Sequence, residues 1–222
     1  MAYILNIETS TKNCSVSIAK DGNTLLCKEV AESGYSHAEK LHVFIEELLL
    51  ELQLKYSDLN AVAVSQGPGS YTGLRIGISA AKGLCYALNI PMIAVDTLEV
   101  LTRKLQISEG FIIPMIDARR MEVYSAIFDA QYQKIRATQA EIITEDSFAN
   151  LEKPVYFVGD SFEKAKAVLT KPNFIFKEDV IYPSASEMGA LSYDKYKKND
   201  TVDVAYFEPY YLKDFMTTAP KK

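Results

Sequence analysis

With 222 residues, 48% of them hydrophobic, the chain is long enough to form one large domain or two small ones around a real core. Its net charge of −5 argues against a protein that binds nucleic acid through its own surface, so any RNA contact is expected to need a partner. The three cysteines are widely spaced, which argues against a disulfide framework and predicts a cytoplasmic protein. No apolar run approaches the roughly 20 residues of a membrane span, which argues against a transmembrane protein.

The first 30 residues predict three antiparallel strands. Residues 3–7 are apolar and are followed at once by a carboxylate, which is unlike a signal peptide. Residues 14–19 alternate apolar and polar side chains, and Asp21-Gly22 predicts a hairpin turn into a strand at 24–30.

An amphipathic helix is predicted from Ser36 to Leu52, because its apolar residues recur every three or four positions. Ser36 followed by Glu39 is a capping-box signature. The two histidines of the chain, His37 and His42, both lie on this helix. Their spacing of five residues is poor for metal binding, and we interpret them as surface histidines.

A strand at 61–65 leads through the Gly-Pro-Gly loop, which runs from Gly67 to Gly73, into a second helix at 72–88 and a strand at 92–95. This order predicts a parallel βαβ crossover. A loop at a helix N-terminus can bind phosphate through backbone N–H groups, but this one lacks the lysine and the spacing of a Walker A motif. A tight structural turn is an equal alternative.

The second helix carries small residues at helical spacing, including Gly73 and Gly77, which leave room for a closely packed neighbour. That neighbour is either another part of the chain or a second protein. Both helices hold more apolar residues than one stripe requires, and surplus apolar surface usually marks an interface. If a second protein docks there, the expected contact residues are Leu41, Ile45, Leu48, Leu49, Leu52, Gly73, Gly77, Ala80, Ala81 and Leu84.

The pattern starts over near Phe111, where Ile116-Asp117 holds the place that Ile7-Glu8 has in the first half. The repetition predicts a duplicated α/β fold with an N-terminal lobe at 1–106 and a more degenerate C-terminal lobe at 107–222. The elements expected in the second lobe are strands at 112–117, 122–129, 140–143 and 155–158, and helices at 162–169 and 186–197.

Glu8 and Asp117 end the first strands of the two halves, where duplicated ATPases place acids that handle phosphate and magnesium. Neither is followed by the glycine that would let the backbone wrap a phosphate, so structural turns are favoured, with Arg119 or Arg120 left as a candidate partner contact. The alternative is a degenerate nucleotide cleft made of Glu8, Thr9, Gly67, Gly69 and Asp117. No catalytic residue, cofactor or metal ligand is predicted.

Four segments resemble the signatures of the TsaB family, formerly called YeaZ: Ile7–Thr11, Ser65–Gly77, Ile116–Tyr124 and, at the C-terminal end, Glu208–Lys213. The resemblance covers nearly the whole chain. It departs at Glu8, where the family more often has Asp, and at Arg119-Arg120-Met121, where the usual Arg-Met-Gly would supply a turn glycine.

The resemblance implies a two-lobed actin-like ATPase (ASKHA) fold, in which each lobe is a mixed sheet flanked by helices. It also implies a part in making threonylcarbamoyladenosine, the modified base next to the anticodon in tRNAs that read codons beginning with A. In the family the transfer is performed by a paralogue, TsaD, which holds a metal on a His-x-x-x-His helix. Thr97 and Leu101 stand at those two ligand positions here, and neither can replace imidazole on a transition metal.

The implied role is therefore that of a non-catalytic subunit that binds TsaD, is joined by the ATPase TsaE, and meets tRNA only through the complex. We expect the helices at 36–52 and 72–88 to form the docking surface, and the same surface to hold a homodimer when TsaD is absent. The alternative is a stand-alone ATP-binding transferase or metalloprotease-like enzyme of the same fold.

Overall fold

A five-stranded mixed sheet forms the first lobe of the computed structural model, which describes residues 1–31 and 37–213. Its first two connections are the antiparallel ones that the sequence predicts. The Asp21-Gly22 turn has positive φ at both residues (50° and 89°), as tight hairpin turns require. The strands are β1 (Tyr3–Glu8), β2 (Asn13–Lys20), β3 (Asn23–Ala31), β4 (Leu59–Gly67) and β5 (Met92–Asp96), in the spatial order β3-β2-β1-β4-β5.

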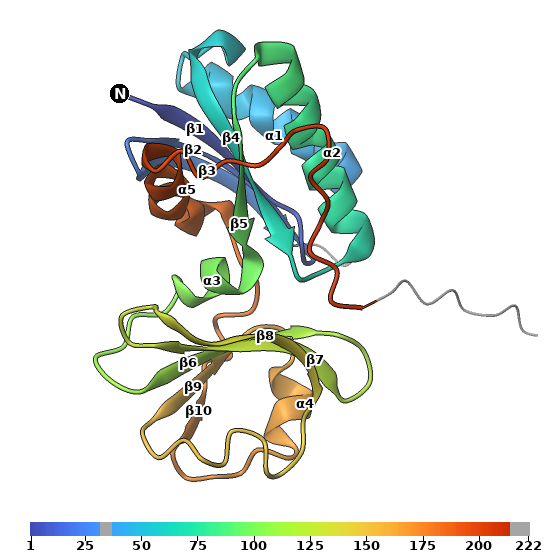
Figure 1. The fold of residues 1–222 in the computed structure, drawn as a ribbon, viewed down its shortest axis with the longest axis vertical. Helices are drawn as coiled ribbons and strands as arrows, with labels where there is room; N and C mark the ends of the chain where they lie inside the picture. Colours follow the sequence, from blue (N-terminus) through green and yellow to red (C-terminus); the bar gives the residue numbers. More distant parts are fainter. Residues whose placement is uncertain (32–36, 214–222) are drawn as a thin grey trace, which may run out of the picture.

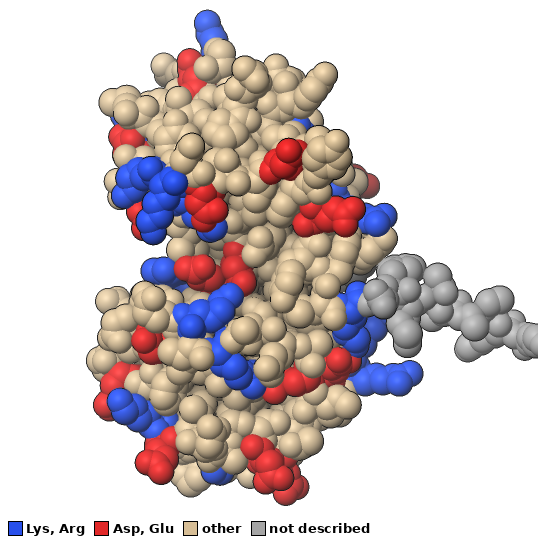
Figure 2. Space-filling model, in the orientation of Figure 1, with Lys and Arg blue, Asp and Glu red and all other residues tan. Residues whose placement is uncertain are grey.

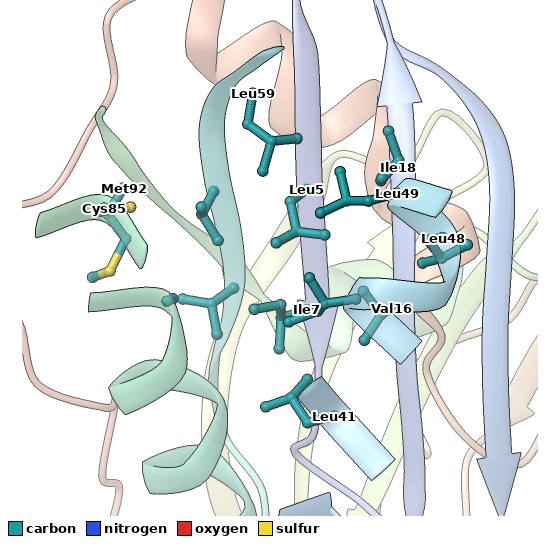
Figure 3. Close-up of a cluster of buried hydrophobic side chains, with 14 of the residues drawn as sticks. Leu5, Ile7, Val16, Ile18, Leu41, Leu48, Leu49, Leu59, Cys85 and Met92 are labelled. Atoms are coloured by element: carbon teal, nitrogen blue, oxygen red, sulfur yellow. The ribbon is translucent and has the colours of Figure 1, made fainter. Parts of the chain in front are cut away.

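Helices cover both faces of this sheet, so its central strands are buried on both sides. The long helices α1 (His37–Glu51) and α2 (Tyr71–Leu88) lie on one face, and α5 (Met188–Lys197) lies on the other (Figure 1). Burying a leucine-sized side chain contributes about 1.5–3 kcal/mol. The core under α1 and α2 includes Leu5, Ile7, Val16, Ile18, Leu41, Leu48, Leu49, Leu59, Cys85 and Met92 (Figure 3).

The second lobe repeats the topology of the first. Its sheet has the order β10-β9-β6-β7-β8, and the first sheet read from its other edge has the order β5-β4-β1-β2-β3. The strands correspond one to one, and the parallel and antiparallel pairings match. The internal duplication is confirmed. The elements are β6 (Phe111–Asp117), β7 (Glu122–Asp129), β8 (Lys134–Ile142), β9 (Val155–Val158), α4 (Phe162–Lys166) and β10 (Phe174–Phe176).

A short helix, α3 (Thr97–Thr102), fills the waist between the lobes. Its Leu98 and Leu101 pack against side chains of the second sheet, including Phe128, in a shared apolar cluster. Lys134 forms an ion pair of 2.6 Å with Asp96 at the end of β5. The helix α3 therefore joins the two lobes through buried apolar contacts.

The end of the chain returns to the first lobe. α5 packs on the first sheet, Val202 bridges to Met92 at its edge, and the backbone N–H of Tyr210 donates to Gln66 O at 2.8 Å. The last part of the predicted lobe at 107–222, from α5 onward, therefore belongs to the first lobe. Apolar side chains of these segments pack against the first sheet. Among the described residues, no helix is long and apolar enough to cross a membrane.

Candidate functional site

Glu8 lies at the end of β1 and is completely buried. One carboxylate oxygen accepts the backbone N–H of Ser10 at 2.6 Å, and the other accepts the hydroxyl of Ser65 on β4. Burial raises the pKa of Glu8 above its ordinary value, against the opposing effect of the bonds from Ser10 and Ser65. The carboxyl group is thus enclosed between two strands, away from solvent.

The Gly-Pro-Gly loop is packed directly against the turn after β1. The N–H of Ser70 donates to Ser10 O at 2.6 Å, and the hydroxyl of Thr9 donates to Gly73 O at 2.8 Å. A Cβ atom on Gly69 would lie 2.3 Å from Ser10 O, so only glycine permits this contact. The structure thus brings Glu8, Thr9, Gly67 and Gly69 together as a packed turn.

Backbone N–H groups of this loop are already used within the protein. That of Gly67 donates to the hydroxyl of Thr97 at 3.2 Å, and that of Gly73 donates to the side chain of Ser70 at 3.2 Å. A phosphate group would have to displace these contacts. The geometry agrees with the interpretation of the loop as a tight structural turn.

Glu8→Gln is expected to stabilise the chain near neutral pH. Because the folded pKa of Glu8 is raised, the folded chain holds the proton more tightly than the unfolded chain, and stability falls as the pH rises above the ordinary range for glutamate. The glutamine amide can still accept from Ser10 without this cost. Thermal unfolding between about pH 4 and pH 8 measures the effect, with exposed Glu152→Gln as the control. A variant that is less stable than wild type at pH 8 would contradict the prediction.

Thr97 and Leu101 are the two positions at which the resemblance places the metal-binding histidines of TsaD. Both are buried. The hydroxyl of Thr97 accepts from Gly67, and Leu101 lies in the apolar cluster between the lobes. Within residues 1–31 and 37–213, no three His, Cys, Asp or Glu side chains are grouped so that they could hold a metal ion.

The histidines of α1 differ from each other. His42 is exposed, as predicted, but His37 is only 1% exposed, and burial lowers its pKa. The prediction of two surface histidines is therefore wrong for His37, because His37 lies on the same inward side of α1 as Leu41. The capping role assigned to Ser36 lies outside the described residues.

Most of the predicted docking residues face the core of the chain itself. Gly73 and Gly77 admit Thr9, whose backbone oxygen and hydroxyl would lie 2.1 Å and 2.3 Å from an added Cβ. Their small size therefore serves internal packing. The residues whose burial corrects the prediction of a direct partner contact are Leu41, Ile45, Leu48, Leu49, Gly73, Gly77 and Ala81.

A groove that is open to solvent lies between the outer faces of α1 and α2, and we call it the helix groove. It has a volume of about 780 Å³, and a Cβ on Gly83 would meet nothing within 4 Å. Of the predicted docking residues, Ala80 and Leu84 line it, while Leu52 is half-buried against the core. The residues that line the helix groove are Ala38, His42, Tyr71, Thr72, Arg75, Ile76, Ser79, Ala80, Gly83 and Leu84.

One end of the helix groove is bordered by an aromatic cluster. The guanidinium of Arg75 stacks 4.2 Å from the ring centroid of Tyr71, and its Nε donates to the hydroxyl of Tyr211 at 3.1 Å. The rings of Tyr71 and Tyr211 are 5.2 Å apart. No local sequence pattern indicates that the C-terminal segment completes this border. Ser79, Ala80 and Gly83, however, could have been found as a second, outward-facing set of small residues on α2.

Asp117, the last predicted cleft residue, ends β6 in the second lobe and is exposed. Its carboxylate pairs with the ammonium group of Lys164 on α4, and its N–H donates to Asp160 at 2.8 Å. Desolvation raises the pKa of Asp160 above its ordinary value. Asp117 thus fixes a turn of the second lobe, whereas Glu8 is enclosed in the first.

Comparison with known proteins places this geometry in a family. A family model described as "TsaD: tRNA N6-adenosine threonylcarbamoyltransferase" matches residues 31–214. The chain is 29% identical over 95% of its length to the tRNA threonylcarbamoyladenosine biosynthesis protein TsaB of Escherichia coli, 94% of which is covered. The tRNA N6-adenosine threonylcarbamoyltransferase of Bacillus subtilis is 35% identical, but over only 42% of this chain and 31% of that protein.

The solved structure of YeaZ from Pseudomonas aeruginosa aligns with a TM-score of 0.82 at 24% identity, covering 96% of this chain and all of that one. The fold is the two-lobed actin-like ATPase fold that the resemblance implies. The TsaB proteins of Escherichia coli and Bacillus subtilis each match 95% of this chain, whereas the transferase matches 42% of it. The chain therefore belongs to the TsaB (YeaZ) family of proteins for threonylcarbamoyladenosine modification of tRNA, within the wider family that the transferase model describes.

Proposed function

We propose that this chain is the non-catalytic subunit that binds a TsaD-type transferase and, with a TsaE-type ATPase, supports threonylcarbamoyladenosine modification of tRNA. The observation that carries the proposal is the open helix groove between α1 and α2. Its small residues would let the helices of a partner approach closely, in a packing of four helices. The transferase relative is similar over 42% of this chain, and it is a candidate for the protein that supplies the second pair of helices.

Exposed apolar side chains on the same two helices support docking of a protein. Val43 and Leu50 on α1 are 45% and 79% exposed, and Tyr86 on α2 is 85% exposed. Covering each leucine-sized side chain would contribute about 1.5–3 kcal/mol. Several such contacts would offset part of the entropy cost of association and help to hold a heterodimer.

The burial of Thr97 and Leu101 supports a role without chemistry, because nothing at these positions can activate a substrate. The chain would act by binding the active arrangement of the transferase more tightly than the inactive one. When the transferase is absent, the same helix groove would accept a second copy of this chain, which sedimentation with and without the partner measures.

Gly83→Trp is expected to leave the fold intact and to abolish co-purification with the TsaD-type partner. The indole ring would fill the helix groove, while the Cβ position itself is open. Ala190→Trp, an exposed small residue on the face of α5 away from the groove, is the matched control. Co-purification and the threonylcarbamoyladenosine content of tRNA are measured in cells that carry each variant as their only copy.

Normal complex formation and normal modification with a folded Gly83→Trp chain would contradict the docking proposal. The stand-alone enzyme is tested separately, by titrating ATP into the isolated chain and assaying bound zinc. Micromolar ATP binding with turnover by the chain alone would contradict the non-catalytic role.

A further inference from the structure

Arg119 and Arg120 are neighbouring basic residues on one exposed turn. Several lysines and arginines elsewhere, among them Lys28, Lys134 and Arg136, form ion pairs with nearby acids. Both Arg119 and Arg120 are exposed, and across the part of the chain that the structure describes neither guanidinium has an ion pair or a hydrogen bond. They are an uncompensated pair of charges on an acidic protein.

These arginines sit on the turn between β6 and β7 in an unfavourable backbone conformation. Their φ values are 72° and 51°, the left-handed region in which a residue with a side chain is disfavoured. Backbone strain of this kind persists only where the surroundings enforce it, and it is concentrated at functional sites.

The surroundings of the turn do enforce its shape. The ammonium group of Lys164 donates to the carboxylate of Asp117, to Arg120 O at 3.0 Å and to Glu122 O at 2.6 Å. Two further bonds close the turn, from the N–H of Ala118 to Glu122 O and from the N–H of Glu122 to Arg119 O, both at 3.1 Å. The two guanidinium groups are therefore carried by a fixed backbone.

The acids of this turn cannot neutralise the arginines, because lysines already bind them. Asp117 pairs with Lys164, and Glu122 pairs with Lys213 of the C-terminal segment. On the face that Figure 2 shows, acidic and basic side chains lie together over both lobes and at the waist. Positive charge is thus left over at the β6–β7 turn.

We propose that the Arg119-Arg120 turn contacts the phosphate backbone of RNA. Guanidinium groups bind phosphate oxygens in a bidentate manner, and a rigid turn loses little entropy on binding. A polyanion is attracted to an acidic chain where neighbouring cations are uncompensated. The inference rests on the proposed function, because the tRNA would be the substrate of the assembled complex.

The test is a titration of labelled tRNA, over a range of salt concentrations, with the complex of this chain and its TsaD-type partner. Arg119→Gly/Arg120→Gly is expected to weaken tRNA binding about tenfold and to reduce the slope of log affinity against log salt by about 1.5–2. The melting temperature of this variant should equal or exceed that of wild type, because glycine relieves the left-handed backbone. A purely structural role would instead lower it.

Arg119→Lys/Arg120→Lys keeps the charges and should retain most of the binding. Lys153→Ala/Lys198→Ala, which removes two exposed cations elsewhere, should leave the tRNA affinity within twofold of wild type. Unchanged affinity and salt slope in the glycine variant would overturn the inference, as would an equal loss in the lysine control. Loss of complex assembly with unchanged tRNA binding would also overturn it and indicate an acidic protein contact.

The same titration on the isolated chain at low salt separates this inference from the proposed function. Weaker binding of tRNA by the glycine variant of the isolated chain would uphold the RNA contact even if no complex assembled. Equal binding by the two isolated chains would overturn it whatever the outcome of assembly.

Discussion

Gly73→Leu is expected to lose its folded structure, with a destabilisation of about 3 kcal/mol or more. A Cβ at this position would lie 2.1 Å from the backbone oxygen of Thr9, which cannot move without shifting the end of β1 or the start of α2. Gly77→Leu should be damaging to a smaller extent, since the atom at 2.3 Å is the side-chain hydroxyl of Thr9. Circular dichroism and the urea midpoint of unfolding measure both variants.

Gly83→Leu on the same helix is the control. It should unfold at the wild-type urea concentration or above it, because its Cβ position is open and leucine is the better helix former. The three glycines together test which face of α2 is internal. Loss of structure in Gly83→Leu with a stable Gly73→Leu chain would mean that the assignment of inner and outer faces is reversed.

Phe128→Ala is expected to cost about 3–5 kcal/mol, a large share of the typical 5–15 kcal/mol of a folded domain. Phe128 is fully buried in the cluster that α3 shares with the second sheet. Because this cluster belongs to both lobes, the whole chain should still unfold in one transition, at a lower temperature. Calorimetry measures the transition, and Ile175→Ala, at a 36% exposed position of β10, is the control.

Two separate transitions, of which only one moves in Phe128→Ala, would contradict the shared core. Such a result would mean that the lobes fold independently and that the contacts of Leu98 and Leu101 across the waist contribute little to stability.

Local sequence patterns located most of the secondary structure. The ranges 122–129 and 155–158 are those of β7 and β9, and the predicted helix at 72–88 differs from α2 by one residue at its start. β10 was missed because it is only three residues long and is held by its neighbour β9. α4 ends at Lys166, three residues before the predicted Leu169.

The docking surface was only partly predictable. Gly73 and Gly83 are both small residues on α2, and no local pattern distinguishes the one that admits Thr9 from the one that is open. His37 was misplaced for the same reason, since its burial depends on what the first turn of α1 packs against. The strained turn at Arg119 and Arg120 is also invisible in sequence, because left-handed backbone at an arginine is enforced by Lys164 from another element.

The sequence by itself determined the duplicated α/β architecture and the family. These follow from hydrophobic periodicity, from turn residues and from the motifs, all of which are local in the chain. Only the tertiary structure decided which small residues serve the core and which line the helix groove, and that the C-terminal segment completes the first lobe. Burial depends on contacts between residues far apart in the sequence, such as Thr9 with Gly73 and Tyr210 with Gln66, and no local pattern records them.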